Sequence, residues 1–455
     1  MNIGLVSQTP LIKFNEEMER EKIIKLSELK KDSYNYTIGG VSIMVNNLIK
    51  KMQENKFASK IYWFALNPKA PYKIIVRNNF ELYNITQQPM MLRAYTNFKE
   101  ILWNNIHGIK HEEFSMEDYL GFLNYNWLVS KAILEIEENI DLLMVHDFQQ
   151  LMIGSMMGPA KPTVLRWHIP FIPENFTFQI RKFIVNGLEG FDSIIVSTKR
   201  DLEGLIRAGY RGVAYQIYPN VDPKKWKRKS KKDAISFGET YGIKEDDFLV
   251  LNVARMDPMK SQDILIKAVA RLKRTIPNIK LMLVGDGSFT SSASGLGSSK
   301  GELHKNYLKE LARKLKIEDK VVFTGYLPNS DLSKAYERAD VFVLPSKIEG
   351  FGLSVVEAWM YEKITIVSRG AGVSELIINN VNGFKFNPED YIELAKLILK
   401  VYKEKQENNE IGKNAHRMAR QCYISNVYKH TERVLRTTLD NFKEYKFVDI
   451  KYKKI

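Results

Sequence analysis

The chain has 455 residues, of which 44% are hydrophobic, and it carries a formal net charge of +15. This length exceeds what one hydrophobic core usually supports, so we expect two domains. No apolar run reaches the roughly 18–20 residues that span a bilayer, and residues 1–10 lack the pattern of a signal peptide. The single cysteine, Cys422, excludes an internal disulfide and a cysteine-built metal cluster. A cytoplasmic protein is the expectation.

The N-terminal half is expected to hold a parallel sheet. Short apolar runs bounded by turn residues predict strands at residues 2–7, 60–66, 142–146, 163–168 and 193–198. A charged stretch from Asn15 to Lys31 predicts a helix between the first strand and the pair Gly39 and Gly40. Two adjacent glycines mark a turn more often than a binding site.

The basic excess is densest at residues 224–232, where only Trp226 and Ser230 interrupt the lysines and the arginine. Together with two prolines, this run breaks the pattern of elements over residues 218–233, which we expect to link the domains. A solvated linker face is the simplest interpretation, and the alternatives are steering of an anionic donor or docking on an acidic membrane. No zinc-finger spacing or RNA-recognition pattern indicates a nucleic-acid partner, and nothing indicates an oligomeric state.

The C-terminal half alternates apolar runs with stretches of helical period, which predicts a parallel sheet covered by helices on both faces. The predicted strands cover residues 248–254, 279–285, 321–325, 341–345 and 364–368. A Ser/Gly-rich stretch from Ser288 to Gly301 predicts a flexible surface insertion. We predict an N-terminal domain of residues 1–222 and a C-terminal domain of residues 223–423, with residues 424–455 packing back on the first domain.

A strand, a glycine-containing loop and a helix follow one another at residues 341–363. Open α/β sheets bind ligands outside the carboxyl ends of their strands, and the first N–H groups of a helix suit phosphates or sugar hydroxyls. Glu349 lies in the loop and Glu357 in the first helical turn, so both carboxylates are expected to face one crevice. Taken alone, they would be a solvated loop residue and a favourable charge at a helix start.

This segment resembles the E-x₇-E motif of the retaining, GT-B-fold glycosyltransferases of group 1, also called family four. In residues 252–263, Arg255 and Lys260 resemble the family's basic pair on the donor pyrophosphate. Further segments resemble the family's signatures in the same order along the chain, and they cover residues 281–287, 323–328, 336–346 and 368–386.

The N-terminal half resembles the family in shorter segments. Gly39 and Gly40 are similar to its glycine loop, whose backbone approaches the donor phosphate. His146 and His168 resemble its two histidine positions at strand ends, although a lone histidine is more often structural. Two features depart from the family pattern: Val221 follows Pro-Asn where the family usually has glycine, and the Ser/Gly-rich stretch follows Gly287.

The resemblance implies a GT-B architecture, with two Rossmann-like, doubly wound α/β domains of parallel sheet facing a central cleft. It places the donor in the C-terminal domain and the acceptor in the N-terminal domain. Arg255 and Lys260 are expected to stabilise the departing phosphate without an obligatory metal or other cofactor. Glu349 is expected to hold the transferred sugar and Glu357 the ribose.

The remaining roles also follow from the resemblance. Backbone groups of Phe351, Gly352 and Leu353 are expected to orient the sugar and the phosphate, and His146 is expected near the reacting centre. The family retains the anomeric configuration, which implies attack on the face from which the phosphate departs. Glu349 is then a positioning group, unlike the nucleophile of a retaining glycosidase.

The expected reaction is transfer of glucose or mannose from a nucleoside-diphosphate sugar to a hydroxyl of a sugar, a glycan or a lipid. Residues 146–149 and 166–170 resemble trehalose glycosyltransferring synthases, which favours glucose as acceptor. The alternative is a related sugar phosphorylase that uses the same pocket for phosphate. A nicotinamide-dependent epimerase should open with a glycine-rich turn, which residues 2–10 lack. A sugar-binding protein without activity should have lost at least one of the predicted site residues Arg255, Lys260, Glu349 and Glu357, but all four are present.

Overall fold

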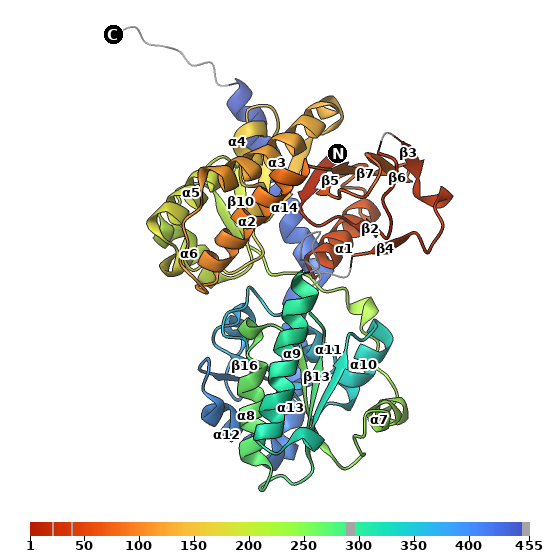
Figure 1. The fold of residues 1–455 in the computed structure, drawn as a ribbon, viewed down its shortest axis with the longest axis vertical. Helices are drawn as coiled ribbons and strands as arrows, with labels where there is room; N and C mark the ends of the chain where they lie inside the picture. Colours follow the sequence, from red (N-terminus) through yellow and green to blue (C-terminus); the bar gives the residue numbers. More distant parts are fainter. Residues whose placement is uncertain (21, 38–39, 288–295, 448–455) are drawn as a thin grey trace. The chain divides into compact units, whose positions relative to one another are not determined.

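In the computed structural model, which describes residues 1–20, 22–37, 40–287 and 296–447, the chain divides into two compact units. Unit 1 comprises residues 1–218 and the chain from Val427 onward, and unit 2 comprises residues 219–426 (Figure 1). The substrate roles expected of the two predicted domains stay predictions. Among the described helices, none has the length and apolar character needed to cross a membrane.

Within the described residues, unit 1 is built on a nine-stranded sheet in the order β11-β10-β9-β8-β1-β5-β7-β6-β3. All neighbouring strands are parallel except β6, which runs antiparallel to β7. The strand order reverses between β1 and β8, so their carboxyl ends form a switch point at which ligands of such sheets bind. The strands are β1 Asn2–Ser7, β3 Ile23–Lys25, β5 Lys60–Leu66, β6 Lys73–Arg77, β7 Phe80–Ile85, β8 Leu142–His146, β9 Thr163–Arg166, β10 Ser193–Val196 and β11 Ala214–Gln216.

The helices of unit 1 are mostly long and amphipathic, and side chains of α2, α3 and α5 share one core with β1 and β8. A separate antiparallel pair, β2 Ile12–Phe14 and β4 Tyr34–Tyr36, follows β1. The helices are α1 Gly40–Glu54, α2 Pro89–Ile106, α3 Met116–Leu134, α4 Ile153–Met157, α5 Phe178–Leu188 and α6 Lys199–Ala208.

Unit 2 holds a fully parallel sheet in the order β14-β13-β12-β15-β16-β17. In chain order this is 3-2-1-4-5-6, the order of a dinucleotide-binding doubly wound sheet, with its switch point between β12 and β15. The strands are β12 Phe248–Val253, β13 Ile279–Val284, β14 Val321–Gly325, β15 Val341–Leu344, β16 Ile364–Ser368 and β17 Phe384–Phe386. The helices are α7 Lys231–Glu239, α8 Gln262–Leu272, α9 Leu296–Lys314, α10 Asn329–Arg338, α11 Leu353–Met360, α12 Tyr391–Lys403 and α13 Lys405–Ala419.

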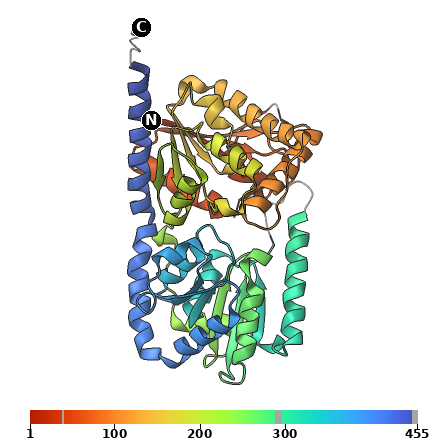
Figure 2. The same cartoon turned by 90° about the vertical axis from the view of Figure 1, so that its left-hand side faces the viewer.

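The predicted strands of unit 2 are confirmed because their side chains are buried on both faces. Val250 and Val343 belong to the core that α8 and α12 cover. On the other face, Tyr336 of α10 packs on Phe342 of β15, and the indole of Trp359 in α11 donates a hydrogen bond to Thr365 of β16. A sheet between two helix layers requires such continuous apolar strands, and the layers are seen in Figure 1 and, from the side, in Figure 2.

The last helix, α14 Ile424–Phe447, belongs to unit 1 from Val427 onward. The buried hydroxyl of Thr438 is 2.8 Å from that of Ser193 in β10, and the guanidinium of Arg436 lies over the ring of Phe57. In unit 2 the two chain segments next to the boundary pair with each other, because Val221 exchanges backbone hydrogen bonds with Cys422 and Ile424.

The helix predicted from Asn15 to Lys31 is wrong. The segment instead contains β3, which pairs with β6, and a 3₁₀ turn. Its backbone bonds to other parts of unit 1: the N–H of Met18 donates to the carbonyl of Lys69, and Arg20 accepts from the N–H of Tyr72. The charges favoured a helix locally, but strand pairing provided partners for the backbone.

The flexible insertion predicted from Ser288 to Gly301 is wrong in its second part. Residues 288–295 lie outside the described residues, but α9 already begins at Leu296. Gly301 is part of this helix, and a Cβ there would lie 2.3 Å from the Cα of Gly287. This glycine therefore allows a close backbone approach, and it does not mark flexibility.

Candidate functional site

Two loops of unit 2 lie at the carboxyl ends of the adjacent strands β12 and β15. The first leads through a 3₁₀ turn, Pro258–Lys260, into α8, and the second leads into α11. The N–H of Lys347 in the second loop donates to the carbonyl of Met259 in the first, at 2.9 Å. The loops are therefore tied together at the switch point of the sheet.

Lys260 and Glu349 form an ion pair between these two loops. Their side chains are only 12% and 21% exposed, so the charges are partly removed from water. Screening by solvent is weak for such a pair, and its attraction is stronger than that of a surface ion pair. The structure thus brings together two residues that were predicted separately, one as a phosphate-binding cation and one as a sugar-binding carboxylate.

The backbone of Glu349 is fixed on its other side by the loop after β16. Its N–H donates to the carbonyl of Gly370, its carbonyl accepts from the N–H of Gly372, and the carbonyl of Phe351 accepts from the N–H of Val373. A carboxylate on a segment with bonds on both sides can be held ready for a ligand without further ordering.

Gly352 and Leu353 form the start of α11, with Gly352 as N-cap. Gly352 adopts φ 107°, a conformation that L-residues rarely take, and a Cβ there would lie 2.7 Å from Leu344. The chain thus turns sharply from β15 into the helix. The N–H of Val355 donates to the carbonyl of Gly352, whereas the very first N–H groups of a helix, here those of Leu353 and Ser354, lack a carbonyl one turn earlier in the helix and suit an anion or a sugar hydroxyl.

Glu357 is the fifth residue of α11, which begins at Leu353, so it lies at the start of the second turn and its predicted place in the first turn is wrong. Its carboxylate accepts a hydrogen bond of 2.8 Å from the hydroxyl of Tyr336. Burial raises the pKa of Glu357 to about 7, and the Tyr336 hydrogen bond opposes this shift. The group therefore changes charge near neutral pH.

Arg255 follows β12 on the same loop as Lys260. Its backbone is held by the neighbouring strand end: Ala254 donates to the carbonyl of Val284, and Met256 to that of Asp286. The carbonyl of Arg255 accepts from the amide of Gln262, while its half-buried side chain stands at the carboxyl edge of the sheet.

The switch point of unit 1 carries a pair of histidines. His146 ends β8, and His168 follows β9. Nδ1 of His146 is 2.8 Å from Nε2 of His168, the ring centroids are 5.1 Å apart and the planes differ by 9°. The rings therefore meet edge to edge in nearly one plane, and one proton lies between them. Nε2 of His146 is buried without a partner in the part of the chain that the structure describes.

Asp147 and Arg166 support this pair. Asp147 has φ 66° and accepts a hydrogen bond of 2.7 Å from the N–H of His168, while Arg166 donates to the carbonyl of Ile217. Burial and the Arg166 charge lower the pKa of His146 to about 3 and that of His168 well below its usual value. Burial raises the pKa of Asp147 to about 7. Both imidazoles are therefore neutral at physiological pH.

Of the predicted glycine loop, Gly39 lies outside the described residues. Gly40 is the exposed first residue of α1, and a Cβ there would meet nothing within 4 Å among the described atoms. No close approach of the chain therefore requires glycine at this position, and its contact with a donor stays a prediction.

Comparison with known proteins relates unit 2 to a family. Residues 236–418, which make up most of unit 2, match the family model described as "Glycosyl transferases group 1". The resemblance inferred from the E-x₇-E segment is thereby confirmed.

The individual relatives of the chain are distant. An uncharacterized glycosyltransferase of Methanocaldococcus jannaschii is 28% identical over 228 residues, which are 49% of this chain and 54% of that protein, so the chain spans about half the length of this curated relative. The trehalose synthase of Pyrococcus horikoshii is 23% identical over 437 residues, which are 95% and 94% of the two chains. The structure of Anabaena HepE in complex with UDP and glucose has a TM-score of 0.70 at 19% identity, covering 96% of this chain and 100% of that chain. The fold is GT-B, as predicted.

Three residues that contribute to the two candidate sites were missed in the sequence. Asp147 and Arg166 stand beside predicted residues in the chain, and an aspartate next to a strand-end histidine is a readable signal. The positive φ of Asp147 is not readable, although Asp tolerates it better than most residues. Tyr336 reaches Glu357 from another helix, and no local pattern indicates that contact.

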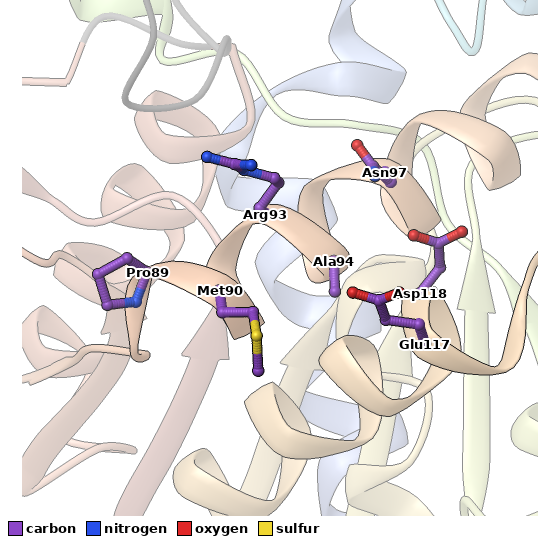
Figure 3. Close-up of a pocket in the computed structure, with 7 residues that line it drawn as sticks. All are labelled: Pro89, Met90, Arg93, Ala94, Asn97, Glu117 and Asp118. Atoms are coloured by element: carbon purple, nitrogen blue, oxygen red, sulfur yellow. The ribbon is translucent and has the colours of Figure 1, made fainter.

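Unit 1 also contains a pocket of about 440 Å³ between the beginnings of α2 and α3. It is lined by Pro89, Met90, Arg93, Ala94, Asn97, Glu117 and Asp118. Figure 3 shows that the guanidinium of Arg93 points away from the two carboxylates. None of the predicted site residues lines this pocket, so it is separate from the His146 site.

A substitution of Gly352 tests how closely the loop between β15 and α11 is packed at this position. Gly352→Ala should lower the free energy of unfolding by about 2–5 kcal/mol, because a left-handed backbone and a crowded Cβ both oppose alanine. Gly242→Ala is the matched control, since Gly242 of the same unit has φ 71° but open space around a Cβ, and it should cost only about 1–2 kcal/mol. Equal urea midpoints for the two variants would contradict the crowding at Gly352.

Proposed function

We propose that this glycosyltransferase moves a hexose, glucose or mannose, from a nucleoside-diphosphate sugar to an acceptor hydroxyl with retention of configuration. The observation that carries the proposal is the Lys260–Glu349 pair at the switch point of unit 2, beside the start of α11. A cation for the phosphate and a carboxylate for the sugar hydroxyls stand there side by side. Retention and the identity of the sugar are extended from the resemblance to the group 1 family.

On the donor side, departure of the diphosphate builds negative charge on its oxygens. Lys260 and Arg255 supply fixed positive charge at the strand ends, and the first N–H groups of α11 add partial charge. In this proposal they take the place of a divalent metal. Glu349 accepts hydrogen bonds from the transferred sugar and Glu357 from the ribose, which positions the anomeric carbon without a covalent intermediate.

On the acceptor side, His146 presents its buried Nε2 at the switch point of unit 1. Because Nδ1 is engaged in the bond to His168, Nε2 of the neutral His146 takes the opposite hydrogen-bonding role and can make a directed hydrogen bond, as donor or acceptor, to a sugar hydroxyl. The departing phosphate takes the acceptor proton in the proposed same-face reaction, and His146 orients the reacting groups.

We propose glucose as acceptor and trehalose as product, in the cytoplasm. The full-length similarity to a protein named trehalose synthase supports this choice. The structurally similar HepE forms a complex with UDP and glucose, which is compatible with it. The alternatives are a phosphorylase reaction that consumes inorganic phosphate, and a glycan or lipid acceptor. A lipid acceptor would give the basic surface a role at an acidic membrane.

A donor and acceptor screen tests the proposal. UDP-, ADP- and GDP-sugars are each incubated with glucose, and both nucleotide release and disaccharide formation are measured. We expect one nucleoside-diphosphate glucose to give a non-reducing disaccharide. Turnover of sugar-1-phosphate with release of inorganic phosphate, without any use of nucleotide sugar, would favour the phosphorylase. Nucleotide-sugar turnover only with lipid-linked acceptors would contradict trehalose formation while keeping the donor assignment.

A further inference from the structure

The basic segment that enters unit 2 is anchored to the unit. The solvated linker face expected at residues 224–232 is confirmed, since most of these residues are exposed, but Arg228, with a side chain 53% exposed, is also bound to α10. Its guanidinium makes two hydrogen bonds of 2.9 Å to the carboxylate of Glu337 in α10, and the N–H of Lys229 also donates to Glu337. The pairing of two guanidinium nitrogens with one carboxylate fixes orientation as well as distance.

Trp226 anchors the same segment through aromatic contacts. Its ring meets Tyr336 edge to face at 5.7 Å, and Tyr336 and Tyr361 are stacked with centroids 5.6 Å apart. The hydroxyl of Tyr361 donates to the carbonyl of Lys227 at 3.3 Å. Such packing holds ring positions within narrow limits. We call Trp226, Tyr336 and Tyr361 the aromatic cluster.

The cluster ends at the carboxylate predicted to hold the ribose. Tyr336 is fully buried, and its hydroxyl lies 2.8 Å from the carboxylate of Glu357 and 3.3 Å from the carbonyl of Ser354. Because two acceptors lie within hydrogen-bond distance, this hydroxyl can form a hydrogen bond with Glu357 in both its ionised and its neutral state. It donates a hydrogen bond to the ionised carboxylate, and when Glu357 is neutral it can donate to the Ser354 carbonyl instead and accept a hydrogen bond from the acid.

We propose that Tyr336 is a positioning residue for Glu357, and that the aromatic cluster makes the linker segment part of the support of the donor site. This proposal rests on the proposed function, in which Glu357 accepts hydrogen bonds from the ribose. With one carboxylate oxygen held by Tyr336, the other is directed at the ligand. Without the hydroxyl, the carboxylate is free to rotate and loses its stabilising donor.

The proposal has a readout in pH that a purely structural tyrosine would not give. Glu357 and Tyr336 shift each other's pKa, and Tyr361 also shifts the pKa of Tyr336. Glu337 and Arg228 in turn shift the pKa of Tyr361. An ionised Glu357 accepts hydrogen bonds from both ribose hydroxyls, whereas the neutral acid accepts fewer. Nucleotide affinity should therefore rise with pH until the carboxylate is fully ionised. Removal of the hydroxyl moves the pKa of Glu357 upward, because the Tyr336 bond lowers it.

The test is the pH dependence of nucleotide affinity. UDP, ADP and GDP are titrated calorimetrically into the full chain from pH 6 to 9, and the tightest ligand is kept. We expect wild-type affinity to level off above pH 7, and Tyr336→Phe to bind about tenfold more weakly at pH 7 and to level off about one pH unit higher. Glu357→Gln should abolish the rise of nucleotide affinity with pH. Adding Tyr336→Phe to that variant should leave the affinity independent of pH. Tyr241→Phe, which removes a hydroxyl elsewhere in unit 2, should behave as wild type.

The possible outcomes of this titration distinguish the role of Tyr336 from the proposed function. Equal pH profiles for wild type and Tyr336→Phe would overturn the proposal while leaving the donor site in place. Failure of the wild type to bind any of the three nucleotides would overturn the proposed function and this inference with it. If Tyr336→Phe does not fold, Trp226→Leu takes its place: weaker binding with the Tyr336 hydroxyl retained supports the role of the linker segment, and unchanged binding overturns it.

Discussion

Replacement of Lys260 by alanine should lower kcat/KM for the nucleotide sugar by about 10²–10³-fold. Lys260 is the cation that touches Glu349, and both groups are shielded from water, so the lost charge is not replaced by solvent. The deficit is expected mainly in kcat, because the diphosphate gains charge as it departs. Initial rates over a range of donor concentrations, together with calorimetric nucleotide affinity, separate the two parameters.

Lys267→Ala is the matched control for this prediction. Lys267 of α8 forms an ion pair with Asp263 in a more exposed position, and such a pair contributes about 0–1 kcal/mol to stability. Its loss should leave kcat within about twofold. A double-mutant cycle with Glu349→Gln adds a second check, since coupled groups give a non-additive result. Additive effects, or a Lys260→Ala enzyme with more than a third of wild-type kcat, would contradict the proposed role.

The parts of the Lys260–Glu349 site could be predicted separately, Lys260 from the resemblance to the group 1 family and Glu349 also from its place after a buried strand. Lys260 and Glu349 are 89 positions apart, but both follow buried parallel strands, and strands of one sheet end at a common edge. The apolar runs of unit 2 indicated the strands, and a doubly wound order made β12 and β15 neighbours. Neither step needed knowledge of side-chain packing.

Features that depend on contacts between elements could not be predicted. The left-handed backbone of Gly352, where a Cβ would lie 2.7 Å from Leu344, cannot be read from the local sequence. The bond between Tyr336 and Glu357 depends on how α10 lies against α11. In unit 1, the charged segment after β2 has helical propensity, but β6 offers it a strand partner. Tertiary contacts decided each case.

His146→Ala should lower the rate of sugar transfer by about 10²–10⁴-fold. This is the range for groups that transfer protons or make hydrogen bonds at a reacting centre. Nucleotide affinity should stay within about twofold of wild type, because the predicted nucleotide contacts lie on unit 2 and at Gly39 and Gly40, and His146 is not among them. Since His146 and His168 share one in-plane hydrogen bond, His168→Ala should give a smaller loss by freeing the orientation of His146. Disaccharide formation and calorimetric binding of the product nucleotide are the two measurements.

The control for the His146 prediction is His107→Ala, which removes another buried imidazole of unit 1, one stacked on Trp103. Both variants lose packing, so a comparable loss of unfolding free energy is expected, and only His146→Ala should lose activity.

The low pKa of His146, about 3, also limits how activity can depend on pH. The imidazole is neutral above that pH, so its protonation cannot cause a loss of activity between pH 5 and 7. A decline there would come from Glu357 or Asp147, whose pKa values lie near 7. If His146→Ala instead weakened nucleotide binding and transfer equally, the residue would be structural, and the acceptor side of the mechanism would have to be assigned to other residues of unit 1.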